Sequence, residues 1–254
     1  MTKVAIIAGG LSGMGLASAK RLLADGVTVC IGARRGADAA VVAELHEKLG
    51  TPVFVDKLDV RDTASVEAFV ARVAEKYGRV DILLNTAGVY EEAPVIGHPD
   101  EMWDAHIDTN LTGSFKMIRA VMPLMKAQGW GRIINLASTA AHEGLENNVA
   151  YCTSKAGLLG LGRCVSLEGA AHGITCVSIS PTWVETEMLK SFVDAETAET
   201  GLPRAEVQAK YEASNPQNKL VQPEEIADLV AFLTSDAARA ITMEDIKVNA
   251  ATNW

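Results

Sequence analysis

The sequence predicts an α/β fold of a single domain over residues 1–254, in which helices flank both faces of a doubly wound parallel sheet of about seven strands. Three observations predict it. Short apolar runs alternate with amphipathic helical segments along the whole chain, the pattern of parallel strands joined by crossover helices. The first apolar run ends in a glycine-rich turn that leads straight into a helix. The 254 residues suffice for one large core, and no long linker divides them.

The expected elements follow one another in a regular order. Strands are expected at the apolar runs 3–8, 27–33, 53–58, 81–84, 131–136, 174–179 and 246–248. Helices are expected where apolar residues recur at helical spacing, at 16–25, 37–49, 64–77, 101–109, 114–128 (with a kink at Pro123), 148–171 and 224–234. The acidic and polar stretch 185–222 predicts a long loop, which is either a functional lid or a surface insertion without fixed structure.

The glycine-rich turn lies between the first strand and the first helix, within residues 9–15. Glycines let the backbone approach a pyrophosphate, and the helix N-terminus supplies N–H donors and a positive dipole. This context predicts a Rossmann-type nucleotide site, with contacts from Gly9, Leu11, Ser12, Gly13, Met14 and Gly15. The alternative is a tight turn that binds no ligand.

A tyrosine and a lysine, Tyr151 and Lys155, are four residues apart in the segment expected to form the longest helix. Residues at this spacing lie on one face of a helix, one turn apart. A neighbouring cation lowers the pKa of a phenol, so the pair is a candidate acid/base device. The alternative is a surface tyrosine beside a solvated lysine. Two further expected strands bring Asn85 and Ser138 to the same carboxyl edge of the sheet.

Together these segments resemble the short-chain dehydrogenase/reductase family, in its single-domain branch of about this length. The match extends over nearly the whole chain. The resemblance implies a catalytic tetrad of Asn110, Ser138, Tyr151 and Lys155, the last two also contacting the cofactor. It further implies cofactor contacts from Asp59, Val60, Asn85, Ala87, Gly88, Pro181, Val184 and Thr186, and a substrate-binding loop at about 185–222. The chain departs from the family pattern at Ala8, Thr86, Thr182 and the C-terminal segment 241–251, which lacks the usual glycines.

The mechanism that the resemblance implies is hydride transfer between a nicotinamide and a ketone or secondary alcohol. Tyr151 would act as the general acid/base, Lys155 would lower its pKa and hold the nicotinamide ribose, and Ser138 would bind the substrate oxygen. Asn110 would position a helix kink and a water. The alternatives are an epimerase or dehydratase on a related scaffold, whose relatives are usually longer, and a nucleotide-sensing protein without catalysis.

The substrate is poorly defined by the sequence. Ser138 and Tyr151 are expected to contact it, together with His142 and Trp183. For His142 the alternative is a loop residue that faces solvent, and for Trp183 it is plain packing.

Cofactor choice depends on the end of the second expected strand. An acidic residue there binds the ribose hydroxyl of NAD, whereas an arginine accommodates the phosphate of NADP. Ala33 stands at the acidic position, and Arg34 and Arg35 follow it. We therefore expect NADP(H), with NAD(H) as the alternative if the two arginines only begin a solvated helix.

Composition points to a cytoplasmic enzyme of ordinary type, with 48% hydrophobic and 22% charged residues. The net charge of -9 argues against nucleic acids and anionic membranes as partners. No apolar stretch reaches the length of a membrane span or reads as a signal peptide. The four cysteines lack metal spacing and are expected to be reduced packing thiols, and no metal site is expected. The family resemblance implies a homotetramer.

Overall fold

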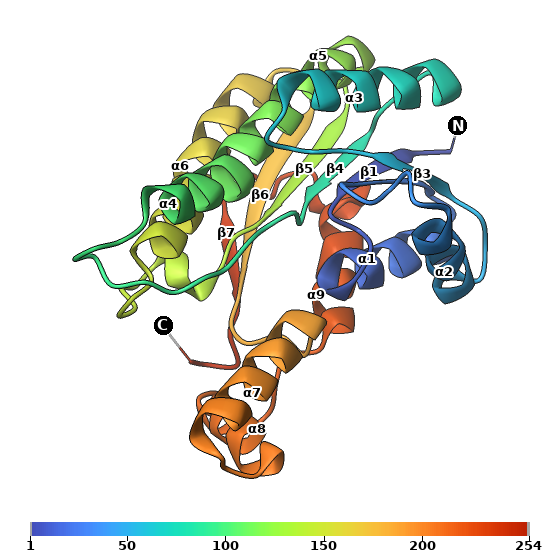
Figure 1. Ribbon diagram of the computed structural model, residues 1–254. Helices are drawn as coiled ribbons and strands as arrows, with labels where there is room; N and C mark the ends of the chain where they lie inside the picture. Colours follow the sequence, from blue (N-terminus) through green and yellow to red (C-terminus); the bar gives the residue numbers. More distant parts are fainter. Residues whose placement is uncertain (1, 253–254) are drawn as a thin grey trace.

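A single parallel sheet organises the protein. The computed structural model describes residues 2–252, in which seven strands form the order β3-β2-β1-β4-β5-β6-β7 (Figure 1). These strands are β1 (Val4–Ala8), β2 (Thr28–Ala33), β3 (Phe54–Lys57), β4 (Ile82–Asn85), β5 (Gly131–Leu136), β6 (Ile174–Pro181) and β7 (Asp245–Val248). Each neighbouring pair is parallel. The predicted fold class is confirmed, while the ends of the expected domain at residues 1, 253 and 254 lie outside the described residues.

Helices cover both faces of this sheet (Figure 1). One face is covered by α1 (Gly13–Ala24), α2 (Ala39–Leu49) and α9 (Pro223–Leu233). The other is covered by α3 (Thr63–Tyr77), α5 (Gly113–Gln128) and α6 (Val149–Ala170), with α4 (Asp100–His106) beside α6. Within residues 2–252, no helix combines the length and the apolar character that a membrane crossing requires.

Local sequence determines where several helices begin and end. The carboxylate of Asp38 accepts a hydrogen bond from Ala40 N at the start of α2, and Asp62 caps the start of α3 in the same way. Both helices end at a glycine in the left-handed conformation, Gly50 with φ 70° and Gly78 with φ 73°. These four residues explain why the predicted bounds 37–49 and 64–77 differ from the observed ones by no more than two residues.

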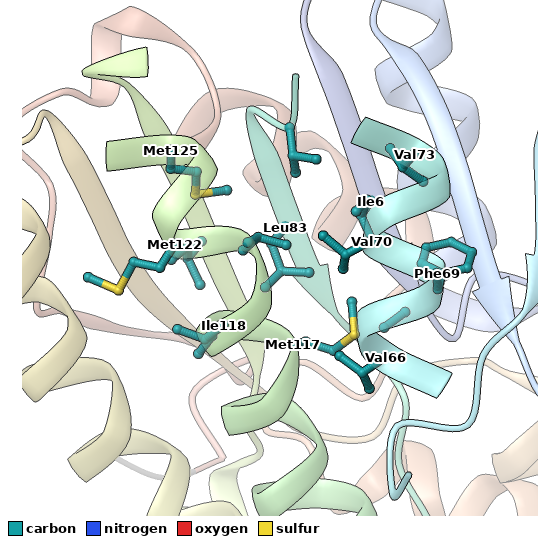
Figure 2. Packing of buried hydrophobic residues seen from close by; sticks show 14 of the residues in the cluster. Ile6, Val66, Phe69, Val70, Val73, Leu83, Met117, Ile118, Met122 and Met125 are labelled. Carbon is teal, nitrogen blue, oxygen red and sulfur yellow. The ribbon is translucent and has the colours of Figure 1, made fainter. Parts of the chain in front are cut away.

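The core consists of two apolar layers, one on each face of the sheet. Along β1 the side chains alternate, so that Ile6 packs toward α3 and α5 while Ile7 packs toward α1 and α9. Figure 2 shows the first layer, where Phe69 and Val70 of α3 and Met117 of α5 meet over the strands. Because both faces are covered, β1 is apolar at every position and lacks the alternation of a half-exposed strand.

The region around Asn110 differs from its prediction as two separate helices at 101–109 and 114–128. The structure has one continuous helical rod, in which a π-helical turn, η1 (Ile107–Thr112), joins α4 to α5. A π-helical turn inserts an extra residue into the helix and often occurs at functional sites. Apolar periodicity marks the two flanking helices but does not reveal how the chain passes between them.

The stretch 185–222 is not the long loop that its polar composition predicted. It contains two helices, α7 (Glu187–Thr200) and α8 (Arg204–Ala213), which lie beyond the carboxyl edge of the sheet (Figure 1). Leu189 and Val193, one turn apart on α7, pack with Val207 of α8 and with Leu220 in a small cluster of their own. Two or three apolar residues per helix suffice here because these helices cover little of the main core.

Candidate functional site

A cleft of about 600 Å³ opens at the carboxyl edge of the sheet. The loops after β1, β2, β3 and β4 line it. It lies at the topological switch point, because β2 and β3 continue the sheet on one side of β1 and β4 begins the other side. The predicted nucleotide-binding residues that line it are Gly9, Leu11, Ser12, Gly13, Met14, Gly15, Arg34, Arg35, Asp59, Val60, Ala87, Gly88 and Thr186.

The glycine turn forms one wall of the cleft and packs too tightly for side chains. Gly9 has a φ of 96°, and a Cβ built on it would lie 2.7 Å from Ala87 N. A Cβ on Gly15 would lie 2.7 Å from the carbonyl oxygen of Gly9. The α1 helix begins at Gly13, and Ser12 before it makes no capping side-chain hydrogen bond. The first-turn N–H groups of α1 are therefore available to an anion in the cleft.

Replacing Gly9 with alanine is expected to destabilise the protein by about 3 kcal/mol, because the new Cβ meets backbone atoms at a residue with positive φ. Urea denaturation measures the change. Gly26→Ala is the matched control, since Gly26 also has a positive φ, 77°, but its Cβ would meet open space. The control is expected to lose only about 1 kcal/mol. Equal losses in the two variants would contradict the close packing of the glycine turn.

Two departures from the family pattern, Ala8 and Thr86, are neighbours in the structure. Thr86 Oγ1 donates a hydrogen bond of 2.7 Å to the carbonyl oxygen of Ala8. The same hydroxyl lies 2.9 Å from the Cβ position of Gly9 and 2.8 Å from that of Gly15. Thr86 thus fills the space behind the glycine turn and ties the ends of β1 and β4 together.

Arginines gather at the opposite end of the cleft. Arg34 and Arg35 follow Ala33 at the end of β2, and both are exposed. Arg61 joins them from the loop after β3 and makes two hydrogen bonds to the Asp59 carboxylate, of 2.9 and 2.7 Å. This bidentate bond to Arg61 lowers the pKa of Asp59 to about 2. This end of the cleft is therefore positively charged, because Arg61 neutralises the carboxylate of Asp59 and Arg34 and Arg35 add further cations.

Tyr151 and Lys155 both lie on α6, one helical turn apart. Lys155 is buried, with 7% exposure, and its Nζ donates a 2.7 Å hydrogen bond to the carbonyl oxygen of Leu136 at the end of β5. The Nζ lies 5.6 Å from the centre of the Tyr151 ring. Ser138, two residues beyond Leu136, is hydrogen-bonded to the Tyr151 hydroxyl. The end of β5 thus holds both the lysine and the tyrosine.

The pKa of Tyr151 is raised in this structure, and a net lowering by Lys155 is not found. Burial raises the pKa of Tyr151, and only the hydrogen bond with Ser138 opposes that shift. The lysine responds to the same enclosure, since burial lowers its pKa to about 8. Both groups are therefore shifted toward their neutral forms.

Asn110 lies in the π-helical turn η1 and is 1% exposed. Its amide forms a two-way bond with the backbone of Val89, accepting from the N–H at 2.8 Å and donating to the carbonyl oxygen at 3.0 Å. It also donates to Ser154 Oγ at 3.0 Å, and Ser154 in turn donates to the carbonyl oxygen of Tyr151. Asn110 therefore joins the loop after β4 to α6.

The tetrad meets the cleft at Gly88. A Cβ built on this cleft-lining glycine would lie 3.3 Å from Asn110 Oδ1 and 3.8 Å from Lys155 Nζ. The structure therefore brings the four predicted catalytic residues together beside the predicted nucleotide site. Such an arrangement can move a proton between the Tyr151 hydroxyl and a molecule bound next to the nucleotide.

Comparison with known proteins agrees with this geometry. A family model described as enoyl-(acyl carrier protein) reductase matches residues 9–251. The D-beta-hydroxybutyrate dehydrogenase of Cupriavidus necator is 36% identical over 242 residues, covering 94% of this chain and 93% of the relative. The acetoacetyl-CoA reductase of Rhizobium meliloti is 35% identical over 249 residues, covering 98% of each chain. The chain belongs to the short-chain dehydrogenase/reductase family.

A solved structure extends the similarity to the whole fold of this short-chain dehydrogenase/reductase. The crystal structure of an actinorhodin polyketide ketoreductase variant with NADPH matches it with a TM-score of 0.93 and 34% identity, covering 100% of this chain and 98% of the other. The protein is therefore an oxidoreductase that acts on keto and hydroxyl groups, in a family that uses NAD(P)H.

The residues of this short-chain dehydrogenase/reductase fit a nicotinamide nucleotide. The glycine turn and the first-turn amides of α1 suit a pyrophosphate, and the arginines suit a phosphate at the far end of the cleft. Within residues 2–252, no group of three or more His, Cys, Asp or Glu side chains is placed to hold a metal ion.

Several predicted residues do not line the cleft, namely Asn85, Pro181, Val184, Tyr151 and Lys155. Asn85 Nδ2 instead donates to Asn135 Oδ1 at 2.9 Å, a buried link between β4 and β5. Residues that were not predicted also line the cleft, among them Gly32, Leu58, Arg61 and Thr109, together with Glu187 and Met188 from the expected substrate-binding loop. Gly32 and Leu58 lie at the ends of β2 and β3, so the rule that ligands bind at carboxyl ends would have indicated them.

The two predicted substrate residues outside the tetrad have partners of their own. His142 Nε2 lies 2.7 Å from the Asp245 carboxylate of β7, so it is neither unpaired nor simply facing solvent. Trp183 packs edge to face against Tyr211, with ring centres 4.9 Å apart, and near Phe192 at 6.3 Å. Trp183 is therefore one of several aromatic rings between β6 and α8.

Proposed function

We propose that this enzyme is an NADP(H)-dependent oxidoreductase that interconverts a ketone and a secondary alcohol, with Tyr151 as the general acid/base. One observation supports this most strongly. The Tyr151 side chain is hydrogen-bonded to Ser138. Lys155 follows one turn along α6 and lies next to the cleft-lining Gly88. A phenol, a hydroxyl and an ammonium are the groups that a carbonyl oxygen needs when it gains or loses a proton.

In this mechanism each side chain has a distinct task. A bound nicotinamide nucleotide supplies or accepts the hydride. The Ser138 hydroxyl binds the substrate oxygen, and the Tyr151 hydroxyl gives that oxygen a proton in reduction or takes one in oxidation. Lys155, held by Leu136, keeps its ammonium one helical turn from Tyr151 and beside the cleft-lining Gly88, where it would contact a bound nucleotide. Asn110 fixes the start of α6 through Ser154, so the tyrosine keeps its position.

The proposal is tested by the oxidation of NADPH, followed by absorbance with a panel of ketones, diketones and 3-oxo esters. Turnover of at least one class is expected. Tight NADPH binding without turnover on any carbonyl would instead indicate a nucleotide-sensing protein.

The preference for NADP(H) is part of the proposal. It is supported by Ala33 at the end of β2, where an acidic side chain would bind a ribose hydroxyl, and by the exposed Arg34 next to it. Replacing Arg34 with aspartate is expected to weaken NADPH binding by roughly 10- to 100-fold, because a charge-assisted bond to the phosphate is lost. Binding of NADH is expected to change by less than about threefold, since it lacks that phosphate. Nucleotide titration by fluorescence measures both constants.

The matched control for this variant is Lys126→Asp, the same reversal of charge on an exposed residue near the far end of α5. It should leave the ratio of the two binding constants unchanged. An equal loss of NADPH and NADH binding in Arg34→Asp would mean that the arginines only begin a solvated helix.

We also propose that the enzyme works in the cytoplasm as a homotetramer, without a nucleic-acid or membrane partner. Exposed apolar residues on α5 and α6, Phe115 at 43% and Leu167 at 69%, support an association between copies. The net charge of -9 supports the absence of anionic partners.

A further inference from the structure

A row of aromatic side chains leads from Tyr151 to the surface. The ring of Tyr90 meets that of Tyr151 edge to face, with centres 4.7 Å apart, and lies 4.9 Å from the ring of Phe192. Phe192 lies 6.3 Å from Trp183, which lies 4.9 Å from Tyr211. All five rings are partly exposed. A molecule that reaches the Tyr151 hydroxyl from this side therefore packs against aromatic faces.

Three separate segments supply these rings and hold them in place. Tyr90 belongs to the loop after β4, and its hydroxyl donates to the Glu92 carboxylate. The neighbouring Ala93 pairs with Asn148 at the start of α6, so this loop is fixed to the helix that carries Tyr151. Phe192 lies on α7, whose first turn contributes to the cleft lining. The rings thus connect the tetrad and the nucleotide cleft with α7 and α8.

Carboxylates surround this aromatic row. The loop segments 91–97 and 145–147 contain no lysine or arginine, and their charged residues, all exposed, are Glu91, Glu92 and Glu146. Residues 187–213, which span α7 and α8, contain six acidic and three basic residues. The three basic residues are each paired with a carboxylate, in the pairs Lys190–Glu187, Arg204–Asp194 and Lys210–Glu196. The field in front of the tetrad is therefore negative, unlike the arginine end of the nucleotide cleft.

Glu92 lies close enough to affect more than one ring of the row. The pKa of Tyr211 is raised to about 12 by burial, by its bond with Glu196 and, further, by the charge of Glu92. The negative charge of Glu92, in the loop after β4, therefore reaches Tyr211 on α8, and both lie along the aromatic row that leads to Tyr151.

From this arrangement we propose that Tyr90, Phe192 and Trp183 are specificity-determining residues that hold the apolar part of a free, uncharged ketone or secondary alcohol beside Tyr151. The surrounding carboxylates disfavour anionic substrates, including thioesters of coenzyme A, whose phosphates they repel. The inference rests on the proposed function, since it names the substrate class of the same site. It also distinguishes this chain from the acetoacetyl-CoA reductase that it resembles over its whole length.

The first test uses two thioesters with the same acyl group. Acetoacetyl-coenzyme A is anionic, whereas S-acetoacetyl-N-acetylcysteamine carries the same reacting carbonyl without phosphates. With NADPH at saturation, kcat/KM for the neutral thioester is expected to exceed that for the coenzyme A thioester by at least about tenfold at low ionic strength. The difference should narrow in about 0.5 M salt, because salt screens exposed charges.

The outcomes separate this inference from the function on which it rests. Turnover of the coenzyme A thioester as fast as the neutral one would overturn the substrate class and leave the oxidoreductase function intact. Failure of every neutral ketone and both thioesters would overturn the proposed function, and the inference with it.

A charge variant separates the effect of the carboxylate charge on substrate choice from the effect of substrate size. Glu92→Lys is expected to raise the ratio of kcat/KM for the coenzyme A thioester to that for the neutral thioester by roughly three- to tenfold. Glu75→Lys makes the same charge change near the C-terminal end of α3, at the opposite edge of the sheet, and should leave the ratio unchanged. An unchanged ratio in Glu92→Lys would overturn the electrostatic part of the proposal.

The aromatic part is tested with Phe192→Ala and two neutral ketones of different size. The ratio of kcat/KM for 1-tetralone to that for butan-2-one is expected to fall by about tenfold, mainly through the KM of the larger ketone. A purely structural defect would lower both values together. Equal losses would therefore overturn the role of Phe192 in specificity, as would no loss at all.

Discussion

Replacing Tyr151 with phenylalanine is expected to lower kcat by about 10²- to 10⁴-fold, the range that a positioned acid or base contributes. The change removes one hydroxyl, which is bonded to Ser138, and leaves the ring beside Tyr90 in place. The dissociation constant of NADPH is expected to stay within about threefold, because the cleft lining does not include Tyr151 and loses no charge-assisted bond. Steady-state kinetics and nucleotide titration measure the two quantities separately.

The direction of the pKa shift adds a pH dependence to this expectation. Burial raises the pKa of Tyr151 above its ordinary value, so the phenol stays protonated through neutral and mildly alkaline pH. Reduction needs the protonated phenol and should therefore persist to about pH 10 in the wild type, while oxidation should rise with pH over the same range. Tyr77→Phe, the same deletion near the far end of α3, serves as the control and should leave kcat unchanged. Wild-type turnover in Tyr151→Phe would exclude the acid/base role.

Much of the fold was predictable because the sheet is covered on both faces. A strand such as β1 is buried at every position, so it appears in the sequence as a continuous apolar run. The capped helices α2 and α3 were predictable for a second reason. An aspartate directly precedes each of these helices and a glycine directly follows it, and both residues have fixed local roles.

The helices α7 and α8 escaped prediction because their stabilising contacts are few and distant in sequence. Val207 of α8 packs against residues of α7 and against Leu220, and no local sequence pattern predicts that cluster. The π-helical turn that holds Asn110 escaped for a related reason. Apolar spacing reports which face of a helix is buried, and an extra residue within one turn leaves that pattern nearly unchanged.

In the site, the residues and their spacing were predictable from the sequence, whereas their pKa shifts and long-range contacts were not. The spacing of Tyr151 and Lys155 places them on one helix face, as the structure shows. The pKa of the phenol depends on enclosure by residues far away in sequence, which reversed the expected direction. The bond between Thr86 and Ala8 is similar, because two separate departures from a family pattern become one contact only after β1 and β4 are paired.

Replacing Lys155 with methionine is expected to stabilise the nucleotide-free protein by about 1 to 3 kcal/mol at pH 7 while lowering kcat on the order of 10²-fold. Methionine matches the length of the lysine stem and carries no charge. Burial lowers the pKa of Lys155 from 10.5 to about 8, so holding its ammonium inside the protein at pH 7 opposes folding. The lost hydrogen bond to Leu136 offsets part of the gain. Urea denaturation of both proteins measures the difference in unfolding free energy.

The sign of the pH dependence makes this expectation specific. Between about pH 8 and 10.5 the unfolded chain binds the Lys155 proton and the folded chain does not, so wild-type stability rises with pH in that window. The advantage of Lys155→Met should therefore be fully present below about pH 8 and shrink toward pH 10.5. Tyr151 does not obscure the change, because its raised pKa confines its own effect to pH values above about 10. Lys20→Met, at an exposed position of α1, should change stability by less than about 0.5 kcal/mol at every pH. A destabilised Lys155→Met at pH 7 would mean that the bond to Leu136 outweighs the burial of the charge, and that the lysine is held for the fold as well as for the reaction.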